Sequence, residues 1–168
     1  MKKRWFSVVL LLLVSGAIYL LYRTEKTAVN TLAASLMGPA FLKNIRATVQ
    51  HRFPLPAFVI YTLPEMLWTA AFTSLSGNLY LRAFRKRIAC FWIPLIIAAG
   101  LELLQLIPDF PGRFDWADLI GAALAWALTV ALISGATTPT QNLFGRLNRE
   151  RLAFTGCYAI MYLAHVWR

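Results

Sequence analysis

Apolar residues gather in long runs along this chain, separated by shorter polar and basic segments. Four of the runs have the length of a membrane crossing and occupy residues 5–22, 54–76, 88–107 and 116–133. A fifth run, residues 152–167, is shorter. About 20 apolar residues in a helix cross the roughly 30 Å of a bilayer's hydrocarbon core. The pattern therefore predicts an all-α fold, a single integral membrane domain over residues 1–168 with four to five transmembrane helices.

The connection between the first two runs is less apolar but keeps a helical period. Apolar side chains such as Leu32 and Leu36 recur at helical spacing among polar ones, which is typical of an amphipathic helix in the membrane interface. We expect this helix over about residues 28–47, broken near Gly38, and a re-entrant segment that dips into the bilayer is the alternative. A weaker pattern of the same kind at residues 143–151 predicts a second surface helix.

Composition and charge favour lipid as the solvent of this chain. It is 59% hydrophobic and 14% charged, whereas an ordinary soluble domain has roughly 45–50% and about 25%. The formal net charge is +10, and in so apolar a chain basic residues serve mainly cytoplasmic loops and anionic lipid headgroups. Membrane lipids are therefore the expected partners, and a nucleic-acid partner is excluded.

The basic residues also predict an orientation. With the N-terminus in the cytoplasm and five spans, three inner segments carry most of them, as the positive-inside rule requires. These residues are Lys2, Lys3, Arg4, Arg82, Arg85, Lys86, Arg87, Arg146, Arg149 and Arg151. Five more lie in residues 23–52, where a surface helix on anionic lipid would use them. The first run is expected to stay as an uncleaved anchor, because a signal-peptide core has only roughly 7–15 apolar residues.

Ionisable side chains at membrane depth are costly and mark functional sites. Glu65 lies within the second run, whereas Glu102 and Gln105 lie near the outer end of the third run and share one helix face. A turn rich in proline and glycine follows and carries Arg113, after which Asp118 opens the fourth run. We predict that Glu102, Gln105, Arg113 and Asp118 converge in a polar ligand-binding pocket on the outer side of the membrane.

Structural roles are open for the same group of residues. Asp115 is placed to cap the fourth helix, and Arg113 then only neutralises neighbouring carboxylates. Glu65 directly follows Pro64 and can hydrogen-bond backbone groups that the proline leaves free. Asp115 and Glu65 therefore complete the set of ligand-binding candidates, each with a structural alternative.

The sequence carries no motif for metal, cofactor or nucleophilic chemistry. His51 and His165 lack the spacing of a metal-binding pair, and neither a glycine-rich phosphate loop nor a G-x-S-x-G elbow occurs. We therefore expect no metal ion and no cofactor.

Small residues at four-residue spacing in the fourth run predict close helix packing. They are Ala123, Ala127, Ala131 and Gly135. Such a ladder lets two helix backbones approach closely, so we interpret it as a core-packing face and not as a binding site.

The polar residues of the third and fourth runs form one recognisable pattern. Glu102 and Gln105 make an E-x-x-Q pair, a Pro-Gly turn carries Arg113, and Asp118 leads into a helix of small residues. Over about residues 94–132, this pattern resembles the VanZ-like family of small bacterial multi-pass membrane proteins.

The resemblance implies a location and a role. The family is named for a protein linked to resistance to the glycopeptide teicoplanin, so the bacterial cytoplasmic membrane and a role at the cell envelope are expected. Ala122 and Ala125 stand where the family usually has Asn and Gly.

The leading hypothesis is a VanZ-like membrane protein whose outer-side pocket binds a polar group of a lipid, a lipid-linked envelope precursor or an antibiotic, and which influences glycopeptide susceptibility. One alternative is an accessory or assembly subunit of a larger membrane complex, with a membrane-protein partner. Another is an intramembrane hydrolase or transferase that uses Glu102 or Asp118 as general acid or base. The sequence favours a binding protein over an enzyme, because no nucleophile or metal motif accompanies these acids.

Overall fold

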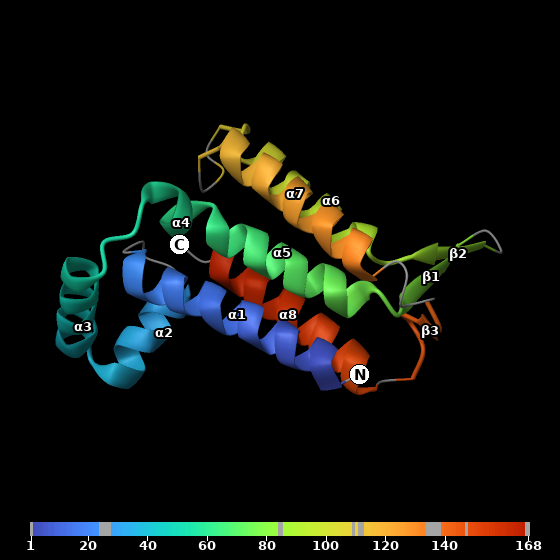
Figure 1. Cartoon of the computed structure of the whole chain (residues 1–168), viewed down its shortest axis with the longest axis horizontal. Helices are drawn as coiled ribbons and strands as arrows, with labels where there is room; N and C mark the ends of the chain where they lie inside the picture. The colour runs from blue at the N-terminus through green and yellow to red at the C-terminus, as the bar shows by residue number, and fades with distance from the viewer. Residues whose placement is uncertain are drawn as a thin grey trace.

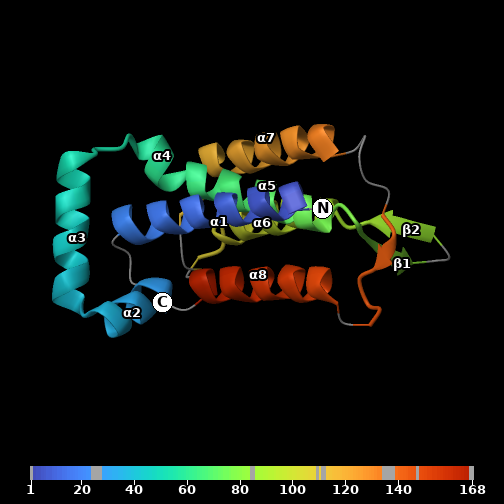
Figure 2. The same cartoon turned by 60° about the horizontal axis from the view of Figure 1, so that its bottom comes forward.

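The helix α5 (Leu63–Ser76) is the centre of a helical bundle in the computed structural model. It contacts α1 (Lys2–Tyr22), α6 (Trp92–Leu104), α7 (Trp116–Ile133) and α8 (Arg149–Val166). Figures 1 and 2 show these five helices running along one common direction. The structure describes residues 2–23, 28–83, 86–108, 110, 113–133, 139–146 and 148–166.

The middle of α5 takes the central place because its side chains are apolar or small on every face. A helix that is hydrophobic all round is buried all round. Its buried apolar side chains are Trp68, Ala71, Phe72 and Leu75. Aromatic rings join it to α8, since the ring centroids of Phe72 and Tyr158 lie 4.7 Å apart and Phe154 packs against the same tyrosine.

The described part of the chain is mostly helical, which confirms the helical class, but the predicted spans differ in continuity. Two helices, Arg4–Tyr22 and Trp116–Ile133, are long and apolar enough to cross a membrane, and Trp92–Leu104 is a shorter apolar helix. The predicted spans 54–76 and 88–107 are not single helices. Prolines keep the chain extended before the short α4 (Ala57–Tyr61), and the start of the 88–107 run belongs to a strand.

The connection after α1 forms two helices, α2 (Ala28–Met37) and α3 (Pro39–Arg52). The break between them falls at Gly38, which confirms the predicted position. Gly38 has a φ of 85°, a left-handed backbone conformation that glycine adopts without steric cost. Pro39 then begins α3, where its missing N–H would have no intrahelical partner in any case.

The described residues also form three short strands beside the helices of this all-α fold. They are β1 (Leu79–Ala83), β2 (Lys86–Ala89) and β3 (Gln141–Asn142). The order in the sheet is β2-β1-β3, with β1 antiparallel to β2 and parallel to β3. The sheet lies at the end of the bundle that holds the N-terminus (Figures 1 and 2), and the basic segment after the second run therefore forms a hairpin.

The predicted second surface helix at residues 143–151 is wrong. Residues 143–146 form a turn, in which the Asn142 side chain accepts a hydrogen bond from the Phe144 N–H at 3.2 Å. Asparagine commonly stabilises such turns in competition with helix. Arg149 and Arg151 belong instead to the first turn of α8.

The packing face of α7 also differs from the predicted alanine ladder. Its buried residues are Gly121, Ala122, Ala125 and Thr129, whereas Ala127 and Ala131 are exposed. A Cβ at Gly121 would lie 2.9 Å from Cγ2 of Thr62. The absence of a side chain at Gly121 therefore sets how closely α7 approaches the start of α5.

Candidate functional site

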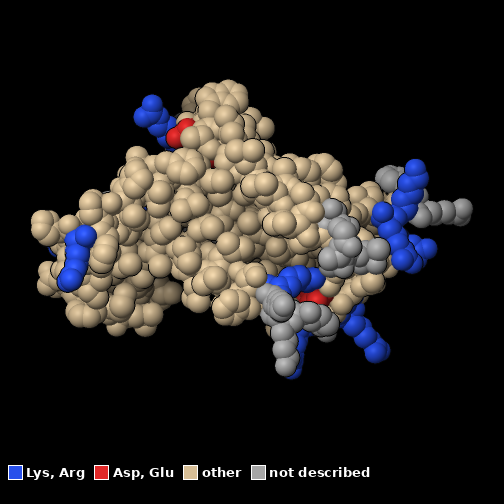
Figure 3. All heavy atoms as spheres, in the orientation of Figure 1, with Lys and Arg blue, Asp and Glu red and all other residues tan. Residues whose placement is uncertain are grey.

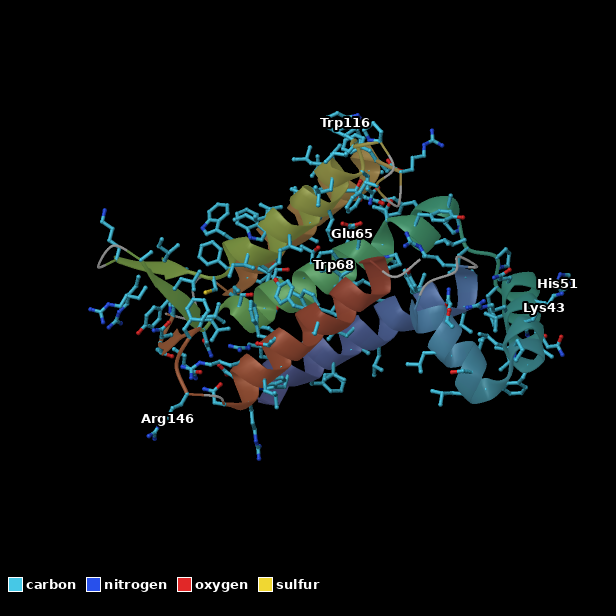
Figure 4. The ribbon with its side chains drawn as sticks, turned by 180° about the vertical axis from the view of Figure 1, so that it is seen from behind. Lys43, His51, Glu65, Trp68, Trp116 and Arg146 are labelled. Atoms are coloured by element: carbon cyan, nitrogen blue, oxygen red, sulfur yellow. The ribbon has the colours of Figure 1, made fainter. Side chains whose placement is uncertain are left out.

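Three carboxylates from three helices meet at the end of the bundle opposite the sheet. Glu65 lies in the first turn of α5, Glu102 in the last turn of α6 and Asp118 in the first turn of α7. One carboxylate oxygen from each of these residues lies within 4.8 Å of the other two. Figure 4 shows Glu65 beneath the end of α7 that carries Trp116. We call these three residues the carboxylate cluster.

Helix ends position the cluster, and they favour its members unequally. The partial positive charge at a helix N-terminus stabilises acidic side chains, which suits Glu65 on α5 and Asp118 on α7. Glu102 lies at the C-terminal end of α6, where the same dipole opposes a negative charge. A local structural preference of α6 therefore does not explain an acidic residue at this position.

Glu102 is held by the backbone of the next helix. It is only 4% exposed, and its Oε2 accepts a hydrogen bond from the Asp115 N–H at 3.0 Å. The Asp115 side chain in turn accepts from the Ala117 N–H at 2.8 Å, which confirms the predicted N-cap. Because the Asp115 side chain is exposed and capping, it lies outside the carboxylate cluster.

Asp118 is held against the start of α5. Thr62, which is 2% exposed, hydrogen-bonds to the Asp118 side chain. Oδ1 of Asp118 is nevertheless buried and has no hydrogen-bond partner among the described residues. The close approach at Gly121, less than one turn further along α7, brings these two helices to this distance.

Arg23 is the site residue that the sequence pattern missed. It follows α1 directly, its Nη2 donates to the Tyr61 carbonyl at 2.9 Å, and its guanidinium lies 5.0 Å from the centre of the Tyr19 ring. Its charge acts on all three members of the carboxylate cluster. Only the packing of α1 against α5 reveals this neighbour, because about forty residues separate it from Glu65 in the chain.

The other predicted residues lie elsewhere. Gln105 is the partly buried C-cap of α6, and Arg113 is exposed. Arg23 therefore takes the place in the site that was predicted for Arg113. The side chain of His165 lies outside the described residues.

The chemistry of the cluster favours positively charged ligands. Three carboxylates at this spacing repel one another, and a cation placed between them would relieve that repulsion. Carboxylate oxygens bind ammonium and guanidinium groups through charge-assisted hydrogen bonds, and they are also the donors that hard metal ions prefer.

No family model, no curated protein and no solved structure matches the chain. The resemblance to the VanZ-like family over residues 94–132 stays a prediction. The residues of the carboxylate cluster are therefore the basis for a functional proposal.

Proposed function

We propose that this chain is a multi-pass membrane protein of the bacterial cytoplasmic membrane, which binds the cationic group of an envelope molecule at the carboxylate cluster. The observation that carries the proposal is the meeting of Glu65, Glu102 and Asp118 within 4.8 Å of one another. A helical bundle needs no such cluster for its own stability, and acidic residues at membrane depth are otherwise avoided.

The surface of the bundle supports its placement in lipid. Large apolar side chains point outward on α1 and α7, where Phe6 is 70% exposed, Leu13 65% and Leu132 82%. On the face shown in Figure 3, charged side chains lie toward the two ends and the broad middle is uncharged. Exposed apolar surface of this extent is favourable when hydrocarbon covers it. Helices α5 and α6 would then cross together with the segments that extend them.

The charges at the two ends support one orientation. Exposed basic side chains at the sheet end include Arg82, Lys86, Arg87, Arg146 and Arg149. The positive-inside rule then places the sheet and the N-terminus in the cytoplasm. The carboxylate cluster would lie near the outer surface, where envelope molecules are reached.

The family resemblance gives the proposal its biological direction. Glu102, Gln105 and Asp118 match the VanZ-like pattern, and two of these three residues belong to the cluster. Binding of a cationic envelope lipid, lipid-linked precursor or antibiotic near the membrane surface would influence glycopeptide susceptibility.

A binding experiment tests the chemistry directly. Purified protein is offered equal amounts of phosphatidylethanolamine, which carries an ammonium group, and phosphatidylglycerol, which does not, and bound lipid is counted by native mass spectrometry. We expect wild type to bind more of the ammonium lipid, relative to phosphatidylglycerol, than Glu102→Gln and Asp118→Asn do. A parallel titration with calcium chloride, read by thermal unfolding, separates a metal ion from an organic cation.

The matched control is Asp115→Asn. It makes the same chemical change in the same segment and keeps an N-cap residue. The charge of Asp115 acts on Glu102 and Asp118, but its exposed side chain lies outside the cluster, so the control changes a nearby charge without removing a carboxylate of the cluster. The control should behave as wild type in lipid binding and in teicoplanin susceptibility of cells that express it. Equal lipid preference in wild type and cluster variants, with susceptibility unchanged at normal expression, would refute the proposal. Stabilisation by calcium alone would replace the envelope ligand with a metal ion.

A further inference from the structure

The helices α2 and α3 form a hook, residues 28–52, across the end of the bundle that holds the carboxylate cluster. Figures 1 and 2 both show α3 at a steep angle to the common direction of α1 and α5. If the bundle lies along the membrane normal, a helix in this orientation lies close to the membrane plane. The hook therefore has the geometry of an interfacial helix and not that of a segment re-entering the bilayer.

The inner face of α3 fixes this orientation. Arg46 donates from Nε to the Leu20 carbonyl at 2.7 Å, and Gln50 donates to the Leu21 carbonyl at 2.8 Å. These carbonyls belong to the last turn of α1, where intrahelical partners are lacking. Arg46 also donates from Nη2 to Oδ1 of Asn30 on α2 at 2.8 Å. The hook is thus tied both to itself and to the end of α1.

The outer side of the hook combines an apolar corner with basic residues. The corner surrounds the break between the two helices, and its side chains are exposed by 40–77%. They are Leu32, Leu36, Met37 and Phe41. Figure 4 shows Lys43 and His51 on α3, pointing away from the bundle, and Arg52 is also exposed.

The charge of the hook indicates which kind of partner its outer surface fits. The sequence has no acidic residue from position 28 to position 64. An apolar corner beside exposed cations is complementary to a lipid interface that carries negative charge, because the apolar side chains enter the acyl boundary while the cations meet phosphates.

We infer that the hook is a docking surface for anionic phospholipid, with its apolar corner inserted below the headgroups and with Lys43 and Arg52 at the phosphates. This inference rests on the membrane placement in the proposed function, but not on ligand binding at the carboxylate cluster. The hook would thereby set the depth of the carboxylate cluster in the membrane relative to the lipid headgroups.

Position-specific quenching in nanodiscs of phosphatidylglycerol and phosphatidylcholine tests the inference on the full chain. An environment-sensitive fluorophore is attached at Leu36→Cys, with Asn44→Cys as the matched position on the polar side of the hook and Leu128→Cys as a reporter on the bundle. Cys157→Ala removes the partly exposed native thiol, and Cys90 is fully buried. Spin-labelled lipid quenches from the acyl region, and iodide quenches from water.

We expect spin-labelled lipid to quench the Leu36 and Leu128 reporters and iodide to quench the Asn44 reporter. The double substitution Lys43→Gln and Arg52→Gln should lower lipid quenching at Leu36 by roughly twofold or more. Replacing all phosphatidylglycerol by phosphatidylcholine should have a similar effect.

Quenching of Leu36 by iodide while Leu128 is quenched by lipid would overturn the inference and leave the membrane placement intact. Shielding of Leu36 from both quenchers would indicate a protein contact and would also overturn it. The anionic partner would be refuted if lipid quenching at Leu36 stays the same when phosphatidylglycerol is replaced by phosphatidylcholine and when Lys43 and Arg52 are substituted. If neither Leu36 nor Leu128 is quenched by lipid, the membrane placement itself fails.

Discussion

The two ends of the bundle differ in the neighbours that surround their buried acidic side chains. At the sheet end, Oε1 of Glu150 lies 3.5 Å from Nη2 of Arg4 and accepts a hydrogen bond from Nδ2 of Asn78 at 3.4 Å. At the other end, three carboxylates face one another, and Arg23 is the basic residue whose charge acts on them. The sheet end therefore satisfies its acid with neighbouring donors, whereas the cluster end brings three carboxyl groups together.

This difference separates structural charge from charge held for a ligand. A buried acid with a cation and an amide beside it has its charge compensated, and removing one partner of such a pair destabilises the protein. Neighbouring carboxylates with incomplete partners lower stability, and such local costs are typical of functional sites. Removal of an acidic charge should therefore act in opposite directions on stability at the two ends, and unfolding in nanodiscs followed by tryptophan fluorescence measures this.

The largest expected effect is at the helix contact that assembles the cluster. Gly121→Ala places a methyl group against Thr62 and Met66, and overpacking of this kind costs about 1–3 kcal/mol. The unfolding midpoint should fall, and ammonium-lipid binding should weaken because Asp118 moves away from Glu65. Gly100→Ala is the control, since nothing lies within 4 Å of its added Cβ. If both variants melt alike, the contact does not set the helix spacing.

At the sheet end, Glu150→Gln removes the charge that faces Arg4 and keeps the size of the side chain. Charge-assisted hydrogen bonds contribute about 1–3 kcal/mol, and the long distances here favour a loss near the lower limit. The unfolding midpoint should fall, and ammonium-lipid binding should stay unchanged. A loss of that binding in Glu150→Gln would end the distinction between the two ends.

The same chemical change in the cluster, Glu65→Gln, should raise stability. At alkaline pH, where all three acids are ionised, removing one of three mutually repelling carboxylates relieves an interaction that outweighs the weakened helix dipole, for a net gain of about 1 kcal/mol. That gain corresponds to an increase of about 2–4 °C in the unfolding midpoint. Destabilisation by Glu65→Gln, as large as that of Glu150→Gln, would show that Glu65 has a structural role.

The smallest effect is expected on the exposed surface of the sheet. Lys86→Gln alters a side chain of β2 that is exposed, and such changes stay within about 0.5 kcal/mol. Unfolding in nanodiscs of neutral lipid should therefore match wild type. A clear loss of stability would mean that the basic hairpin supports the fold and is not only a solvated surface.

Local signals predicted the helices and several of their ends. The apolar runs marked the bundle helices, glycine marked the break at Gly38, and the pattern around Asp115 marked a helix cap, because each depends on residues near in the chain. The E-x-x-Q spacing placed Glu102 at the end of a helix that faces the next one. Periodicity failed at residues 143–151, where the hydrogen bonds of Asn142 favoured a turn over a helix.

Contacts between distant segments were beyond the reach of such signals. The alanine ladder predicted the wrong face of α7, because the close approach is made by Gly121 against a side chain of Thr62. The pairing of β3 with β1 joins segments about sixty residues apart, so no local pattern predicts it. Arg23 likewise reaches the cluster only through the packing of α1 on α5.

Apolar content and period made this chain a helical protein suited to lipid, and the cost of ionisable groups at membrane depth pointed to Glu65, Glu102, Asp115 and Asp118 among the candidates. These properties belong to single segments, so residue order is sufficient to read them. Tertiary packing decided that the three carboxylates meet and that Arg23 and not Arg113 accompanies them. Each of these outcomes depends on the distance between helices, which side-chain shape at the helix contacts determines.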